Sequence, residues 1–213
     1  MKASMTMATA SMALGSACGS AMAGFNAPNA HSWPMEHVMV TFDNGAISAH
    51  ANNDSSSPIQ LLRFEGESYS GAAASLDDTY YSDQYGWVPD GFISLGADEF
   101  LWIETVSSTA GLNVYEGGMR MMRENHSYDA ILGTDGSDNA WMWGGTMTHN
   151  WYSAESLGAY EVTYEVFVGD ALGNALSAYT SDTVTLFFNA VPSPAALSVL
   201  GLVGLVAASR RRA

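Results

Sequence analysis

Cysteine and positive charge are both scarce in this chain. Cys18 is the only cysteine among 213 residues, so no intramolecular disulfide can form. Lysine and arginine together number 7 against 22 acidic residues, which gives a formal net charge of −15 at pH 7. A chain this acidic is repelled by nucleic acids and by anionic membrane surfaces, so we exclude both as binding partners.

Motifs for catalysis are also missing. The sequence has no G-x-S-x-G elbow and no phosphate-cradling glycine loop, and its single lysine is Lys2. Adjacent acids such as Asp77 and Asp78 would point to opposite faces of a strand. We therefore expect no enzymatic activity, although two carboxylates from separate strands, as in glycosidases, are an alternative that sequence leaves open.

The N-terminal segment has the pattern of a secretory leader. Lys2 is followed by a weakly apolar run of alanine, methionine and serine, and residues 21–23 form an A-x-A cleavage site. We expect residues 1–23 to be a signal peptide that signal peptidase removes. Residue Cys18 would leave with it, so the mature chain would contain no cysteine.

The C-terminal segment, residues 191–213, has three unlike parts. Its opening, Val191-Pro192-Ser193-Pro194, cannot be helical because each proline fixes its own φ and disfavours helix before it. Residues 195–208 are apolar apart from one serine and would rise about 21 Å as a helix, which is short for a membrane core of about 30 Å. Basic residues that can snorkel follow, and they favour a cytoplasmic position for the end of the chain. They are Arg210, Arg211 and Arg212.

This tail resembles the PEP-CTERM sorting signal of Gram-negative bacteria. Val191, Pro192 and Pro194 match its V-P-x-P opening, and the terminal arginines match its basic end, whereas Ser193 stands where the family often has glutamate. The resemblance implies recognition by an exosortase-type membrane protease, transient anchoring in the inner membrane, removal of the tail, and release or attachment at the cell surface. An ordinary C-terminal membrane anchor is the alternative.

Residues 24–190 form the body of the protein and are long enough for one domain. Short apolar runs separated by turn signals such as Asn44-Gly45 predict an all-β fold, a single β-sandwich of the jelly-roll or immunoglobulin-like type. The clearest strand is 159–168, where large apolar residues alternate with polar ones over nine positions. Other expected strands are 37–42, 46–50, 59–64, 92–95, 100–106, 112–115, 141–148 and 183–188.

The body also resembles the surface-anchored domain known as choice-of-anchor M, which recurs in PEP-CTERM proteins repressed by the zinc uptake regulator. The matching pieces occur in the same order: Glu36-His37-Val38, Trp87-Val88-Pro89, residues 91–96, residues 148–151 and residues 158–163. The resemblance implies a surface domain. That family often has a second histidine beside the position that corresponds to His149, and this chain has none there. This difference weakens the argument that a metal site of the family is present in this chain.

Three histidines are candidate metal ligands because of the chemistry of the imidazole side chain, independently of any resemblance to a family. Neutral imidazole is a good zinc ligand, His37 and His50 flank the expected hairpin, and His149 lies on a later strand. No local spacing such as HxH or HExxH supports the site, so separate surface histidines are the alternative. Residues 133–139 resemble a calcium loop only loosely, and we interpret them as a plain turn.

Two groups of aromatic residues invite opposite interpretations. Trp141, Trp143 and Trp151 are expected in the core, because tryptophans at period 2 usually pack there. The more polar stretch that contains Tyr80, Tyr81, Tyr85 and Trp87 is the better candidate for a surface that binds extracellular polysaccharide.

Together these features predict an exported protein of the cell surface or extracellular matrix with a structural or adhesive role. A zinc-binding surface module, with calcium as the second choice of metal, is one alternative. A carbohydrate-binding surface module is the other.

Overall fold

A computed structural model describes residues 28 and 35–192 of the chain. The expected signal peptide, the apolar run of the tail, Pro194 and the three terminal arginines lie outside the described residues. Within the described part, no helix has the length and apolar character that crossing a membrane requires.

Strands dominate the described part, as an all-β fold requires, and its helices are three short 3-10 helices of one or two turns. The strands are β1 Glu36–Asp43, β2 Ala46–Ala51, β3 Ile59–Leu62, β4 Tyr80–Ser82, β5 Tyr85–Pro89, β6 Phe100–Ser108, β7 Leu112–Gly118, β8 Ala130–Ile131, β9 Ala140–Trp143, β10 Thr148–Ala154, β11 Gly158–Gly169 and β12 Asp182–Val191. The 3-10 helices are η1 Gly71–Leu76, η2 Arg123–Asn125 and η3 Thr134–Gly136.

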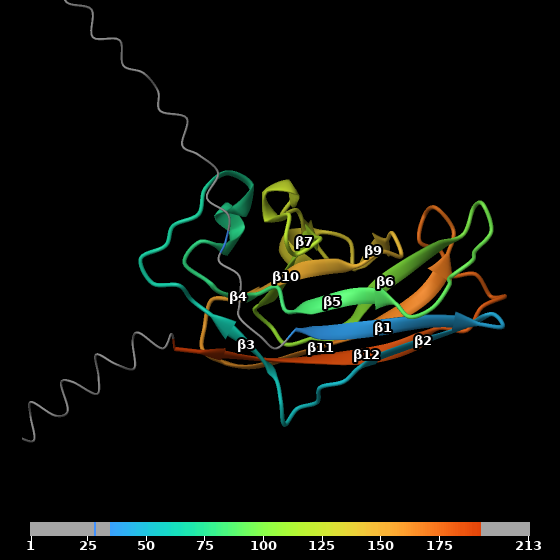
Figure 1. Ribbon diagram of the computed structural model, residues 1–213, viewed down its shortest axis with the longest axis horizontal. Coiled ribbons are helices and arrows are strands. Elements are labelled where there is room, and N and C mark those ends of the chain that lie inside the picture. Colours follow the sequence, from blue (N-terminus) through green and yellow to red (C-terminus); the bar gives the residue numbers. More distant parts are fainter. Residues whose placement is uncertain (1–27, 29–34, 193–213) are drawn as a thin grey trace, which may run out of the picture.

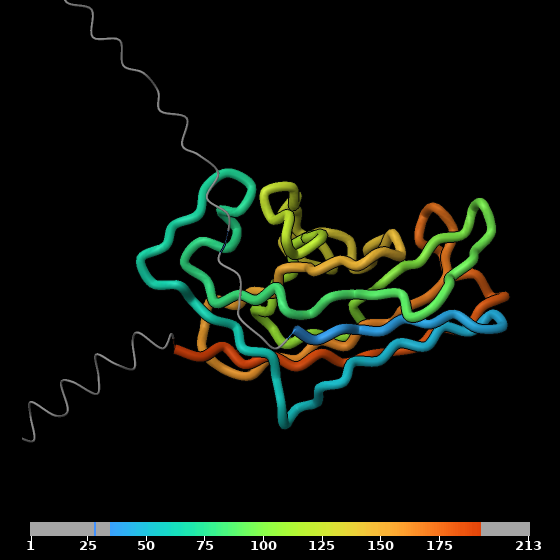
Figure 2. Tube along the Cα trace, in the orientation of Figure 1, coloured from blue at the N-terminus to red at the C-terminus, as the bar shows by residue number. Residues whose placement is uncertain are grey.

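All twelve strands belong to one sheet that folds back over itself (Figure 1). Its main path is β2-β1-β5-β10-β4-β3-β12-β11-β6-β9, with β7 and β8 branching from β10. The sheet returns to its starting edge near β12: the N–H of Ile47 in β2 donates to Thr180 O at 2.8 Å, and the N–H of Ala49 donates to the Asp182 carboxylate at 3.0 Å. The chain trace in Figure 2 shows the resulting two layers.

The expected hairpin between β1 and β2 is confirmed. Val38 pairs with Ala51 and Asp43 with Ala46, and the two residues between the strands, Asn44 and Gly45, have φ values of 49° and 84°. A tight turn with both central residues at positive φ matches the right-handed twist of the strands, which is why Asn-Gly favours it.

The alternation in residues 159–168 is confirmed as far as Val166, after which Phe167 and Val168 are both buried. Along β11, Tyr160, Val162, Tyr164 and Val166 are buried, whereas Glu161 is exposed. Strand β11 pairs antiparallel with β12 on one side and with β6 on the other, so it lies in the middle of its layer. Strand β12 ends at Val191, opposite Leu62 of β3, so the first residue of the expected tail belongs to the sheet.

The core between the two layers is rich in aromatic side chains. Trp87 of β5 packs against Trp143 of β9 and Tyr164 of β11, with ring centroids 6.3 and 5.8 Å apart. Tyr85 and Phe188 form a second contact at 5.1 Å. These rings join the strands of opposite layers. Each large buried aromatic side chain stabilises the fold by an amount on the order of a few kcal/mol, through the apolar area that it removes from water.

A smaller apolar cluster lies on the outer face of the sheet at one end. Trp151 of β10, Tyr81 of β4 and Tyr115 of β7 are covered there by the loops that carry η1 and η2 (Figure 1). Tyr128 stacks on Trp151 with ring centroids 5.6 Å apart. The loops are therefore packed against the sheet and cover this end of it.

Two of the expected strands are wrong. Residues 92–95 form no strand but an irregular loop between β5 and β6. Residues 141–148 are not one strand, because β9 ends at Trp143 and β10 begins at Thr148. Gly144 and Gly145, the latter at φ 64°, separate them with a turn that interrupts the apolar run.

Candidate functional site

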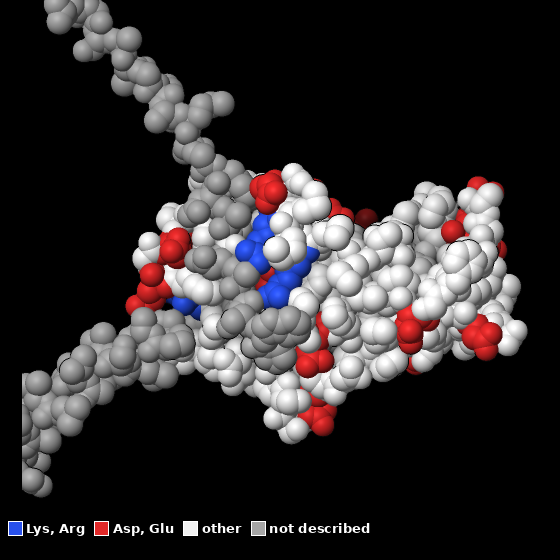
Figure 3. Space-filling view, viewed as in Figure 1, with Lys and Arg blue, Asp and Glu red and all other residues white. Residues whose placement is uncertain are grey.

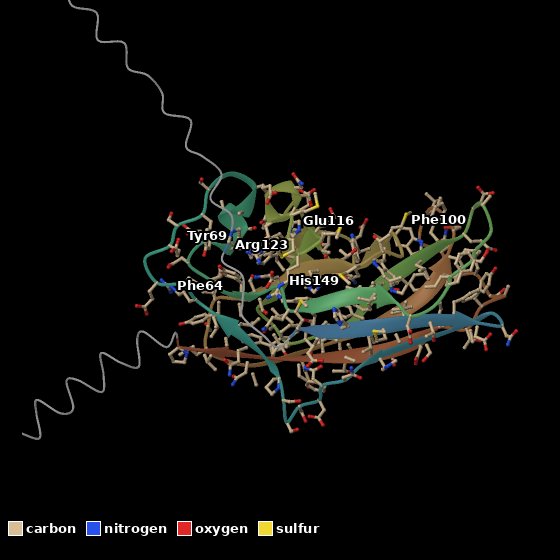
Figure 4. The ribbon with its side chains drawn as sticks, viewed as in Figure 1. Phe64, Tyr69, Phe100, Glu116, Arg123 and His149 are labelled. Carbon is tan, nitrogen blue, oxygen red and sulfur yellow. The ribbon has the colours of Figure 1, made fainter. Side chains whose placement is uncertain are left out.

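A groove of about 610 Å³ opens at the end of the sheet where β5 leads into β6. The loop of residues 91–96 forms one wall, and the ends of β6 and β9 form the other. Figure 4 labels Phe100 at this end of the molecule, away from the loops with η1 and η2. The apolar part of the lining consists of Phe92, Ile93, Leu95, Phe100, Leu101, Met142 and Trp143.

Phe92 is the most exposed aromatic side chain of the groove. It is 88% exposed, whereas Ile93 and Leu95 pack partly against the core and hold the loop in place. Met142, on the opposite wall, is 39% exposed. Large apolar side chains gathered around a concave surface are typical of binding sites.

Glycines leave the backbone of the groove accessible. Gly91, Gly96, Gly144 and Gly145 all belong to the lining. A Cβ atom placed on Gly144 would meet no atom within 4 Å, so the space beside this backbone is open. Peptide groups that no side chain covers can exchange hydrogen bonds with a polar ligand.

Glu99 fixes the loop of the groove to a neighbouring loop. Its Oε2 atom accepts hydrogen bonds from the N–H of Gly96 and from the hydroxyl of Tyr179, both at 2.7 Å. The bond from Tyr179, with that from Gly96, lowers the pKa of Glu99 below its ordinary value. The carboxylate is therefore ionised at neutral pH and acts as an acceptor at the rim of the groove.

A buried charge cluster lies at the opposite end of the sheet. Asp83, between β4 and β5, has a side chain only 1% exposed, and its Oδ2 atom lies 3.2 Å from Nε of Arg120 and 3.4 Å from Nε of Arg123. The two arginines form the larger basic patch in Figure 3, where the acidic residues are scattered around it. The pairing of Arg123 with Asp83 connects the loop with η2 to the β4–β5 turn. Arg123 also donates to Pro28 O at 3.3 Å.

His149 of β10 lies beside this cluster, and Figure 4 labels it together with Arg123. It is 1% exposed, and its Nδ1 donates a hydrogen bond to Asp83 O at 2.8 Å. Burial lowers the pKa of His149, so the ring is neutral at pH 7. The His37 ring lies next to it, with ring centroids 5.9 Å apart and an interplanar angle of 73°.

The three predicted metal ligands are only partly brought together. His37 and His149 are neighbours, whereas His50 is an exposed residue of the edge strand β2, opposite Met39. Across residues 28 and 35–192, no three His, Cys, Asp or Glu side chains gather closely enough to hold a metal ion.

The loop of residues 133–139, interpreted as a plain turn, closes on itself. The N–H of Gly133 donates to the Ser137 hydroxyl at 3.2 Å, and residues 134–136 form the 3-10 turn η3. Ser137 therefore bonds within the loop.

The expected aromatic binding surface is wrong. Tyr81, Tyr85 and Trp87 are at most 1% exposed and belong to the two apolar clusters. Tyr80 is partly buried against the larger of these clusters. The stretch resembles a polar surface in sequence because Ser82, Asp83 and Gln84 interrupt it, yet these three are buried too. The assignment of Trp143 and Trp151 to the core is confirmed, and Trp141 is partly buried against it.

Sequence reasoning missed Phe92, Asp83, Arg120 and Arg123. The two arginines had a signal, because the body contains only three basic residues and these two are three positions apart. Phe92 had none, since it was expected to pack in a strand. No protein-family model matches this chain, and no curated protein matches it either.

Proposed function

We propose that this protein is exported by a Gram-negative bacterium and has an adhesive role at the cell surface or in the extracellular matrix. The leader of residues 1–23 supports cleavage by signal peptidase. The tail, with Val191, Pro192, Pro194 and the terminal arginines, supports processing by an exosortase-type membrane protease. For the two-layered sheet we propose a β-sandwich of the jelly-roll or immunoglobulin-like type.

The groove beside β6 and β9 is the observation that carries the adhesive role. We propose that it binds a segment of a neutral extracellular polysaccharide. The apolar face of a sugar ring can stack on Phe92, which is 88% exposed at the rim. The uncovered peptide groups of the glycine-lined wall can accept hydrogen bonds from sugar hydroxyls or donate to them, and the Glu99 carboxylate can accept hydrogen bonds from them.

The negative charge of the body favours binding of a neutral polysaccharide over an anionic one. The 22 acidic residues all lie in the body, and Glu99 contributes one of these charges at the groove itself. A uronic acid or sulfated chain would be repelled by this field, whereas a neutral chain would not.

The test is binding of neutral and anionic polysaccharides to the full chain, followed by calorimetry with the fragments that bind. We expect Phe92→Ala to weaken binding by roughly 2- to 13-fold, since stacking on an aromatic ring contributes about 0.5–1.5 kcal/mol. Leu172→Ala is the matched control, because Leu172 is 86% exposed but lies on the loop after β11, outside the groove lining.

Equal affinity of wild type and Phe92→Ala for every neutral glycan would contradict the groove as the binding site. Preferential binding of anionic glycans would contradict the argument from charge. A metal-binding role is the second candidate function, favoured by the pairing of His37 with His149.

A further inference from the structure

Three neighbouring strands place two histidines on either side of one glycine. In the parallel pairing of β1 with β5, His37 lies opposite Gly86. In the antiparallel pairing of β10 with β5, His149 lies opposite the same Gly86. Residues directly opposite each other in a sheet project to the same face, so both imidazole rings share the space over a backbone without a side chain.

One nitrogen atom in each of the two imidazole rings has no hydrogen-bond partner in the described structure and is available to bind a ligand. Because Nδ1 of His149 donates to Asp83 O, its Nε2 atom retains a lone pair. That Nε2 atom lies over Gly86, where an added Cβ would be only 2.5 Å from it. The Nε2 atom of His37 is buried and has no hydrogen-bond partner in the described structure, which costs stability unless a ligand occupies it.

We propose that His37 and His149 bind a divalent transition metal ion, Zn²⁺ or Cu²⁺, through their Nε2 atoms. Imidazole nitrogen suits both ions. A ligand histidine usually donates its other ring N–H to a carbonyl or carboxylate, as His149 does to Asp83 O. Water or a ligand from outside completes the coordination.

The spacing of the two rings fits this coordination. With Zn–N bonds of about 2.0–2.1 Å in a tetrahedral arrangement, two ligand imidazoles would have centroids about 5 Å apart. The observed centroid distance of 5.9 Å is close to this value. Gly86 is essential to the geometry, because a side chain there would collide with the His149 ring and displace it.

The experiment is a calorimetric titration of the full chain in mild detergent with Zn²⁺, repeated with Cu²⁺ and followed by EPR spectroscopy. We expect His37→Ala and Gly86→Ala each to raise the Kd about tenfold or more, and His50→Ala to leave it unchanged. The Cu²⁺ spectrum of the wild type should show hyperfine coupling to two imidazole nitrogens, and that of His37→Ala to one fewer. Cys18 and His31 are the same in all variants, so ions bound there contribute equally.

The His37→Ala variant carries the test if Gly86→Ala does not fold, since His37 is only partly buried. Circular dichroism establishes that each variant is folded before titration. Unchanged affinity in His37→Ala would overturn the proposal. Equal loss in His50→Ala would also overturn it, because His50 lies outside the pair.

Discussion

The Asp83 carboxylate accepts a hydrogen bond from Nε of Arg120 at 3.2 Å inside the protein, where the aspartate side chain is 1% exposed. Arg123 shares the same oxygen atom. Burial removes these charged groups from water, and the free-energy cost of this desolvation is offset by the attraction between the paired charges. An exposed pair in the same protein, Arg63 with Asp78, has side chains 40% and 76% exposed and offers a direct comparison.

We expect Asp83→Ala to lower the free energy of unfolding by about 3–5 kcal/mol, because two arginines would be left without their shared counter-ion. Asp78→Ala should lower it by less than about 1 kcal/mol, since solvent screens the exposed pair. Urea denaturation of both variants measures the difference. Similar values for the two would show that burial of Asp83 does not strengthen its pairing.

A second prediction concerns two buried tyrosines of the core. Tyr164 is fully buried, and its hydroxyl has no hydrogen-bond partner in the described structure. The hydroxyl of Tyr85 accepts a hydrogen bond from the N–H of Phe187 at 3.2 Å. We expect Tyr164→Phe to raise the free energy of unfolding by about 1 kcal/mol, and Tyr85→Phe to lower it by about 1 kcal/mol.

Denaturation of the two phenylalanine variants in parallel gives a matched comparison, because each loses one oxygen atom from the same core. A loss of stability in Tyr164→Phe as large as that in Tyr85→Phe would mean that an internal water bonds the Tyr164 hydroxyl.

The stability of the protein should also fall on acidification through His126. Nδ1 of His126 accepts from Trp151 Nε1–H at 2.9 Å, and its Nε2–H donates to Met119 O at 3.1 Å, so the folded ring is neutral. Burial lowers the pKa of His126 below its ordinary value of 6.5. As the pH falls through 6.5, the unfolded chain takes up a proton that the folded chain does not, and the free energy of unfolding decreases.

The measurement is the free energy of unfolding in urea at pH values from 8 to 5, for the wild type and for His126→Gln. The wild-type value should fall by up to about 1.4 kcal/mol per pH unit more steeply than that of the variant, because glutamine does not titrate. His149 is present in both proteins and cannot cause a difference. Parallel curves would contradict the role of His126.

Local signals in the sequence explain which parts of the fold could be predicted. The Asn44-Gly45 turn and the alternation in β11 depend on neighbouring residues, so the hairpin and this strand were predicted correctly. Strands β4 and β5 were missed because a buried polar segment, Ser82 to Gln84, forms the end of β4 and the turn that leads to β5. Polar residues normally indicate a surface segment. Here the hydrogen bonds and ion pairs that allow these polar side chains to be buried come from the tertiary structure, which the local sequence does not reveal.

The candidate sites depend on pairings between distant strands, which no local pattern encodes. His37 and His149 meet only because β1 and β10 both pair with β5 at Gly86. The expected third ligand, His50, lies in the hairpin beside β1, but it pairs with Met39 rather than with His37 and is exposed on the edge strand β2. The groove depends on Phe92 leaving the sheet, which the Gly91 φ of 101° marks but does not by itself specify.

The tail gives the last prediction, which tests export independently of any ligand. Val191 is the final residue of β12 and pairs with Leu62, so the Pro-x-Pro opening follows the sheet directly, without a linker. We expect the double variant Pro192→Ala/Pro194→Ala to keep the tail, because alanines would let helix extend back toward the sheet and remove the rigid opening. Mass spectrometry of the protein from a Gram-negative host with an exosortase-type protease measures this. Ser193→Ala is the control and should be processed as the wild type is, while a wild-type mass that includes residues 193–213 would contradict processing altogether.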